Sequence, residues 1–251
     1  MTVSELEDSM KKIMSFGLPM VALVALSAVD VRAQSNPWSV SFDAGSHIAL
    51  SGDVHGSGSG TVLNLPTQVQ ARSYKEVYGN GFYWAAGLGY RVGMRGEIRV
   101  QGSYTANPAD RLQVGTVAGL PLFALFDDYQ AFGMDFGYRQ YVGGAKARPF
   151  AGVSGGFVRV NKIQSEFSVP AAAVVLPNVN MYDTSIVPSF GVGGGVQIAL
   201  SERFAVQGGV EFKWQGDADD LDGLAGTGLE SINDKSRRWS MPITGGVTLR
   251  F

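Results

Sequence analysis

The feature that most constrains this chain is a strict alternation of apolar and polar residues over unusually long stretches. In residues 204–214 (FAVQGGVEFKW) every second position is apolar or glycine, and the amide and charged side chains fall only between them. A period of two places successive side chains on opposite faces of a β-strand. Residues 188–200 and 239–251 repeat the pattern. Each stretch therefore predicts a strand with one apolar and one polar face.

The length of these strands and their aromatic residues indicate a membrane protein. Strands of soluble proteins usually have about 5 or 6 residues, whereas a tilted strand needs roughly 9 to 11 to cross the hydrocarbon of a bilayer. Phe204 and Trp214 stand at opposite ends of one apolar face, as do Trp239 and Phe251. Membrane barrels carry aromatic girdles at both interfaces. Membrane-spanning strands are therefore favoured over a soluble lipocalin-like or sandwich fold.

Five further stretches, 38–50, 82–90, 97–104, 132–138 and 150–160, bring the number of predicted strands to eight. The register of Phe150–Val160 stays open, and Gly155-Gly156 is a candidate β-bulge. Short connections at 91–95, 141–147 and 201–203 alternate with long ones at 51–81, 106–126, 161–185 and 215–236. We predict an all-β fold, an eight-stranded antiparallel transmembrane up-and-down β-barrel over residues 34–251, with both termini periplasmic.

Energetics decide which face of the strands meets lipid. A Lys or Arg on the lipid face near the midplane costs roughly 2–4 kcal/mol. Slipping the strand around Ile98 by one residue would expose both Glu97 and Arg99, so the apolar face must point outward. Eight strands leave an interior just wide enough for side chains. We predict that it holds a network of paired charges, with a gated ion path as the alternative. The network comprises Asp43, Glu97, Arg99, Asp135, Arg139, Glu211, Lys213, Arg238 and Arg250.

Residues 1–33 have the composition of a secretory signal peptide. Lys11 and Lys12 precede an apolar run that ends at Val29, and Val31-Arg32-Ala33 has the small-residue pattern of a cleavage site. We expect cleavage after Ala33; an uncleaved anchor is the alternative. The chain has no cysteine, and it has no basic patch that would favour nucleic acid.

At this point the chain resembles the small outer-membrane barrels typified by the OmpA membrane domain, OmpX and OmpW. The resemblance covers residues 36–251 and rests on the strand count, the alternating connections and the ending Val247-Thr248-Leu249-Arg250-Phe251. It implies location in the cell outer membrane, in contact with lipid and lipopolysaccharide. It also implies that Phe251 is the signal to the outer-membrane assembly machinery. No cofactor is expected.

The long connections contain features that suggest contacts at the cell surface. Two apolar stretches suggest a hydrophobic vestibule, although longer strands or loops packed on each other would also explain them. Their apolar residues are Leu120, Leu122, Phe123, Phe126, Val174, Val175 and Leu176.

The tract Gly56–Gly60 (GSGSG) is typical of a flexible linker. Four carboxylates, those of Asp217, Asp219, Asp220 and Asp222, make a weak calcium candidate, because Leu221 departs from the EF-hand spacing. A solvated acidic loop is the simpler interpretation.

Catalytic signals are thin. Residues 152–156 match the G-x-S-x-G pattern but lie within a predicted strand, whereas a nucleophile elbow needs a strand, a turn and a helix. Asp43 and His47 share one face and are a weak hint of lipid A-modifying chemistry. We therefore expect a non-enzymatic outer-membrane protein with an envelope-structural or surface-interaction role. A narrow channel or transporter for small, mostly hydrophobic solutes is the alternative, and a lipid A-modifying enzyme comes third.

Overall fold

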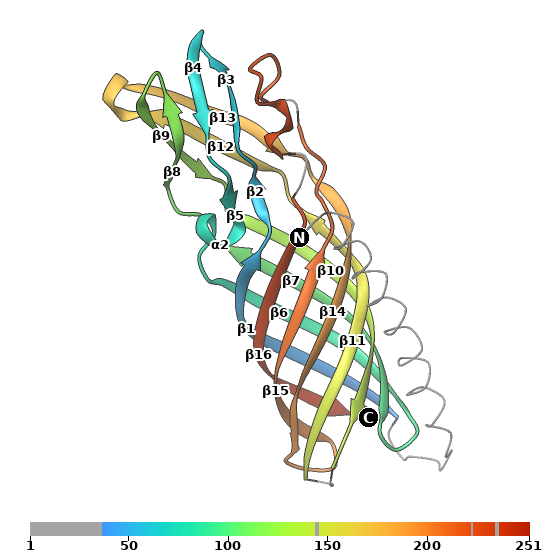
Figure 1. The fold of residues 1–251 in the computed structure, drawn as a ribbon. Coiled ribbons are helices and arrows are strands. Elements are labelled where there is room, and N and C mark those ends of the chain that lie inside the picture. Colours follow the sequence, from blue (N-terminus) through green and yellow to red (C-terminus); the bar gives the residue numbers. More distant parts are fainter. Residues whose placement is uncertain (1–36, 144–145, 222, 234–235) are drawn as a thin grey trace, which may run out of the picture.

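The protein is described by a computed structural model that covers residues 37–143, 146–221, 223–233 and 236–251. The predicted signal peptide and Asp222 lie outside these residues. Eight long strands form a closed antiparallel barrel in the order β1-β16-β15-β14-β11-β10-β7-β6 (Figure 1). The barrel strands are β1 (Trp38–Ser51), β6 (Gly81–Val92), β7 (Gly96–Asn107), β10 (Tyr129–Tyr141), β11 (Ala147–Val160), β14 (Ser185–Ala199), β15 (Phe204–Gln215) and β16 (Arg238–Arg250). All eight predicted strands and the barrel are confirmed.

Pairing of β1 with β16 closes the barrel. Ser39 lies opposite Arg250, and the backbone N–H of Phe251 donates to the carbonyl of Trp38 at 3.1 Å. Closure satisfies the backbone groups of every barrel strand, as a bilayer requires. Trp38 and Phe251 lie at the end of the barrel that carries the short turns. The side of the membrane that this end faces stays a prediction.

The barrel is apolar outside and polar inside. On β10, Phe136 is 58% exposed, while the preceding Asp135 is only 5% exposed. Aromatic residues form two groups on the outer surface, one at each end of the barrel. The edge-to-face pair of Trp38 and Tyr90 belongs to the short-turn end. The other group includes Phe82, Trp84, Tyr104, Phe132, Trp214 and Trp239.

The structure fixes the register of β11, which the sequence left open. Phe157 points outward and is 61% exposed, whereas Val158 is buried inside. The pairing of β11 with both neighbours runs without a shift, so the predicted bulge at Gly155-Gly156 is wrong. The strand hides its register because apolar residues lie on both faces: Phe150 fills part of the lumen, and Val158 packs into the core above it.

The long connections are largely folded into β-structure, which we call the extension; Figure 1 shows it at the end of the barrel opposite the short turns. Its main sheet has the order β13-β12-β9-β8-β4-β3. These strands are β3 (Gly58–Val62), β4 (Leu65–Val69), β8 (Leu112–Val117), β9 (Leu120–Phe126), β12 (Ile163–Val169) and β13 (Val174–Tyr182). Smaller elements are β2 (Asp53–His55), β5 (Arg72–Ser73), α2 (Tyr74–Val77), η1 (Pro170–Ala172) and η2 (Glu230–Asn233).

The Gly-Ser tract is not a flexible linker, so this prediction is wrong. Residues 58–62 form β3 and pair with β4 along their whole length. Glycine is needed here for close approach rather than for flexibility, because a Cβ on Gly60 would collide with the carbonyl oxygen of Thr227.

A hydrophobic core joins the extension to the barrel. Tyr74 and Val77 of α2 are buried in it together with Met181 and Tyr182 of β13. The Tyr182 hydroxyl donates to the carbonyl of Val54, which ties β13 to β2. The core therefore covers the mouth of the barrel. No helix in the described part of the chain has the length and hydropathy to cross a membrane.

Candidate functional site

The lumen near the short turns is filled by polar side chains. Glu97 of β7 accepts hydrogen bonds from the Ser39 hydroxyl at 2.8 Å and from the Tyr141 hydroxyl. The Arg250 guanidinium donates to the Gln197 side-chain carbonyl at 2.5 Å. Alternation on five different strands directs these groups inward, because the opposite faces carry the apolar residues that point out. The space left among them is about 10 Å³, room for about one water molecule.

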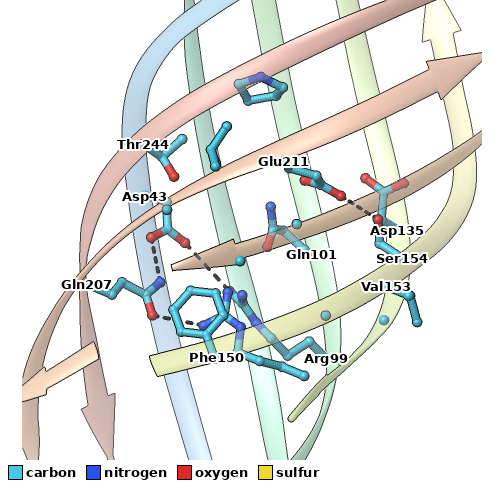
Figure 2. Close-up of a pocket in the computed structure, with 18 of the residues that line it drawn as sticks. Asp43, Arg99, Gln101, Asp135, Phe150, Val153, Ser154, Gln207, Glu211 and Thr244 are labelled. Atoms are coloured by element: carbon cyan, nitrogen blue, oxygen red, sulfur yellow. Dashed lines mark hydrogen bonds and ion pairs between the residues drawn. The ribbon is translucent and has the colours of Figure 1, made fainter. Parts of the chain in front are cut away.

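A second layer crosses the middle of the barrel. Asp43 forms an ion pair with Arg99 at 3.5 Å and accepts a hydrogen bond from the Gln207 amide at 2.5 Å. Arg139 donates to the same Gln207 at 3.0 Å and lies over the Phe150 ring at 3.9 Å from its centre. Figure 2 shows Asp43, Gln207, Arg99 and Phe150 converging on a cavity of about 110 Å³.

A third layer lies closer to the extension. Lys213 and Asp135 form an ion pair whose two side chains are 4% and 7% exposed. Asp135 also accepts a hydrogen bond from the Ser189 hydroxyl at 2.9 Å. Glu211 accepts a hydrogen bond from the Ser154 hydroxyl at 2.5 Å (Figure 2). These groups satisfy one another without a ligand.

Arg238 seals the lumen where the barrel meets the core of the extension. Its guanidinium donates to the Gln215 side-chain carbonyl at 2.7 Å and to the Tyr129 hydroxyl. It also lies 4.0 Å from the Tyr129 ring centre and 4.7 Å from that of Tyr74. Cation–π contacts of this kind stabilise a desolvated cation. Tyr74 comes from α2, so the seal combines the barrel wall with the extension.

The nine charged residues predicted for the interior all lie on inward-facing positions. Four form the two ion pairs described above. The other five, Glu97, Arg139, Glu211, Arg238 and Arg250, hydrogen-bond mainly to neutral side chains. Among the described residues, the lumen is thus packed in layers of hydrogen-bonded and ion-paired side chains.

An apolar cavity of about 320 Å³ lies in the extension. It is lined by strands of the main sheet, by His55 of β2 and by residues of the last long connection between Gly223 and Ile232. Of the predicted apolar loop residues, Leu120, Leu122, Val174 and Leu176 line it. Phe123 instead lies beneath the Arg111 guanidinium, Phe126 is buried in the core, and Val175 is 54% exposed on the other face of β13.

Among the residues that line this cavity, His55 is the titratable one, and the sequence did not single it out. It lines the cavity and stacks on Phe126, with 5.9 Å between the ring centres. Its Nδ1 lies 3.1 Å from the carbonyl oxygen of Gly56. Burial lowers the pKa of His55 below its ordinary value, because a charged imidazole would be poorly solvated there. Only its place as one of two histidines in the chain could have drawn attention to it.

The remaining candidate residues are not brought together into a site. The Asp217 carboxylate accepts hydrogen bonds from the backbone N–H groups of Ser236 and Arg237, at 2.7 and 2.8 Å. No cluster of three possible metal ligands occurs in the described residues, Asp219 and Asp220 included. Ser154 donates to Glu211 and not to a histidine, and Asp43 faces Arg99 rather than His47.

Comparison with known proteins gives structural likeness only. No model of a protein family matches the chain, and no curated protein matches its sequence. Neisserial surface protein A is 13% identical, with 85% of this chain and 97% of that chain covered and a TM-score of 0.46. Ail of Yersinia pestis is 9% identical, with 86% and 99% covered and a TM-score of 0.40. Outer membrane protein W of E. coli is 15% identical, with 87% and 100% covered and a TM-score of 0.31. Likeness at this level carries no argument about function.

Proposed function

We propose that this chain is an integral outer-membrane barrel that binds small apolar molecules in the cavity of its extension. The single observation that carries the proposal is an apolar cavity of about 320 Å³ at the end of a packed barrel. In this proposal the barrel anchors the cavity in the membrane, and the extension faces the cell exterior.

The outer surface of the barrel supports the membrane location. Large apolar side chains such as Phe136 at 58% and Ile98 at 51% are exposed, while Arg99 and Asp135 are buried. In water this arrangement would expose far more contiguous apolar area than soluble proteins tolerate. In a bilayer the same faces meet acyl chains, and closure leaves no strand edge unpaired. Contact with lipopolysaccharide and recognition of Phe251 by the assembly machinery belong to this proposal.

The cavity has the properties of a small-molecule site. Its volume lies at the lower end of the roughly 300–1,000 Å³ typical of such sites, which are mostly apolar with few polar groups. Leu122 and Met181 are almost completely buried around it. The lumen below the cavity is packed with side chains. This packing favours binding of an apolar molecule in the cavity, or its passage by another route, over its passage along the barrel axis.

A second candidate is an envelope-structural or surface-contact role with no ligand. The packed lumen favours it, because the layers of ion pairs and hydrogen bonds need no occupant. We do not propose a catalytic activity, because the three candidate residues contact other partners than one another. Ser154 donates to Glu211, Asp43 pairs with Arg99, and His47 stacks on Tyr129.

Two neighbouring residues of β13 provide the test. Val174 lines the cavity, and Val175 points to the opposite face. The purified protein in lipid nanodiscs is titrated with the apolar fluorophore N-phenyl-1-naphthylamine, and the signal of empty nanodiscs is subtracted. We expect saturable binding that Val174→Trp weakens at least tenfold and Val175→Trp leaves unchanged. Absence of saturable binding to the wild-type protein would overturn the proposal in favour of the structural role.

A further inference from the structure

Basic side chains gather at the short-turn end of the barrel. This end comprises residues 37–39, 91–97, 141–143, 146–150, 197–204 and 248–251. Among these described residues the acidic side chains are Glu97 and Glu202, and the basic ones are Arg91, Arg95, Lys146, Arg148, Arg203 and Arg250. Three of the arginines, Arg91, Arg148 and Arg250, are half-buried at the rim of the lumen, and we call them the arginine cluster.

Contacts in the last layer of the lumen bring the arginine cluster together. Arg91 and Arg250 line the same small space, beside Gln197 and Tyr141. Arg250 donates to the Gln197 side-chain carbonyl at 2.5 Å, and Arg148 lies opposite Gln197 in the pairing of β11 with β14. The Arg148 guanidinium lies over the Tyr141 ring, 4.5 Å from its centre. The three positive charges are close enough to act on one another.

The carboxylates at this end do not balance the arginine cluster. Glu97 is 7% exposed and already accepts hydrogen bonds from the hydroxyls of Ser39 and Tyr141. Glu202 is exposed in the turn between β14 and β15. The single negative charge of Glu97 therefore faces three guanidinium groups, and their mutual repulsion is an electrostatic cost that a bound anion would remove.

The arginine cluster also retains hydrogen-bond donors. A guanidinium has five N–H donors and no acceptor. Among the described residues, the Arg250 side chain donates to Gln197 alone, and the Arg148 side chain donates to the Met94 carbonyl alone, at 3.3 Å. The planar fork of arginine matches the oxygens of a carboxylate or a phosphate, which the ammonium group of lysine meets only as a point charge.

We propose that the arginine cluster binds a phosphate group at the rim of the barrel. A phosphate monoester carries about −1.5 to −2 charge at neutral pH, so it neutralises more of the cluster than a carboxylate does. The edge-to-face pair of Trp38 and Tyr90 adjoins Arg91 on the outer surface, and such aromatic residues stand at the level of lipid headgroups. The phosphate therefore belongs to a lipid headgroup or to a soluble phosphate ester. This site is independent of the apolar cavity at the other end of the molecule.

The test uses dodecyl maltoside micelles, because this detergent contains no phosphate. Inorganic phosphate is titrated into the folded protein by calorimetry, with the ionic strength held constant by sodium chloride. We expect saturable binding that Arg148→Gln weakens about 5-fold or more, because a charge-assisted contact is lost. The matched control is Arg159→Gln, which removes an exposed arginine at the far end of the same strand and should leave binding unchanged.

A short-chain lipid, dihexanoyl phosphatidic acid, distinguishes the two sources of phosphate. If it binds more tightly than inorganic phosphate, the site takes a lipid headgroup, and if it does not, the site takes a soluble phosphate; both results support the proposal. Arg148→Lys keeps the charge and replaces Arg148→Gln if gel mobility shows that the latter does not fold. Without the planar fork it should bind phosphate about 3-fold more weakly than the wild type.

Three results would overturn the proposal. The first is that the folded wild-type protein shows no saturable binding of either inorganic phosphate or the lipid. The second is that every folded Arg148 variant binds phosphate as tightly as the wild type. The third is that Arg159→Gln weakens binding as much as the Arg148 variants do, because the effect then reflects the overall charge of the protein and not the arginine cluster.

Discussion

The ion pair of Lys213 and Asp135 is the most direct test of how the lumen is packed. With side chains 4% and 7% exposed, neither charge can recover water when its partner is removed. Lys213→Met leaves the Asp135 carboxylate with the Ser189 hydroxyl as its remaining partner. Removing one member of a buried pair costs about 3–5 kcal/mol, because the other charge is left uncompensated. We therefore expect Lys213→Met to lower the free energy of unfolding by about that amount.

The double variant separates the charge effect from the loss of packing. Replacing both members of a buried pair by neutral groups is often close to neutral. Lys213→Met combined with Asp135→Asn should therefore recover most of the loss, with a coupling energy of roughly 2 kcal/mol or more. The control is Lys75→Met on the exposed side of α2, which should change stability by less than about 0.5 kcal/mol.

Urea unfolding in lipid vesicles, followed by tryptophan fluorescence and by the gel mobility of unheated samples, measures these differences. The two readouts report burial of the strands and closure of the barrel. The packing is refuted if the losses of unfolding free energy of Lys213→Met and Asp135→Asn add up to that of the double variant within about 0.5 kcal/mol. It is also refuted if Lys213→Met alone costs less than about 1 kcal/mol, because the lumen is then more hydrated than this packing implies.

Two further predictions concern the seal and the extension. In planar bilayers the wild-type protein should give no unitary currents above the protein-free membrane, because packed side chains leave a cavity of only about 110 Å³ in the middle of the lumen and Arg238 closes the layer above it. Stable current steps would refute the seal. Gly60→Val should abolish fluorophore binding and make the extension protease-sensitive, because a Cβ at this position meets the Thr227 carbonyl, while the barrel keeps its heat-modifiable gel mobility. The control is Gly102→Val, where a Cβ has open space around it, and this variant should change neither fluorophore binding nor protease sensitivity.

The barrel could be predicted from the sequence because a bilayer imposes one simple rule on every residue of a strand. Ile98 must point out if Glu97 and Arg99 point in, so the alternation alone sets the register. The rule fails where inward residues are also apolar, as for Phe150 and Val158 on β11.

The extension could not be predicted, because its strands do not follow this alternation of apolar and polar residues. Strands β9 and β13 carry apolar residues at consecutive positions, since one face lines the cavity and the other packs or is exposed. Strand β3 is rich in glycine and serine and depends on close contact with Thr227 instead of side-chain burial. The place of His55 in the cavity wall depends on residues from distant segments, Phe126 and Ile232 among them, and no local pattern brings these together.

The seal and the cavity meet in the same hydrophobic core. Arg238 lies at the boundary between the polar lumen and the apolar core. It donates a hydrogen bond to Gln215 of the barrel wall, and its guanidinium lies over the ring of Tyr74 from the extension. Tyr74 belongs to the core cluster that also contains Met181 and Ile232, which line the cavity. Opening the lumen at this layer would therefore remove the support beneath the cavity.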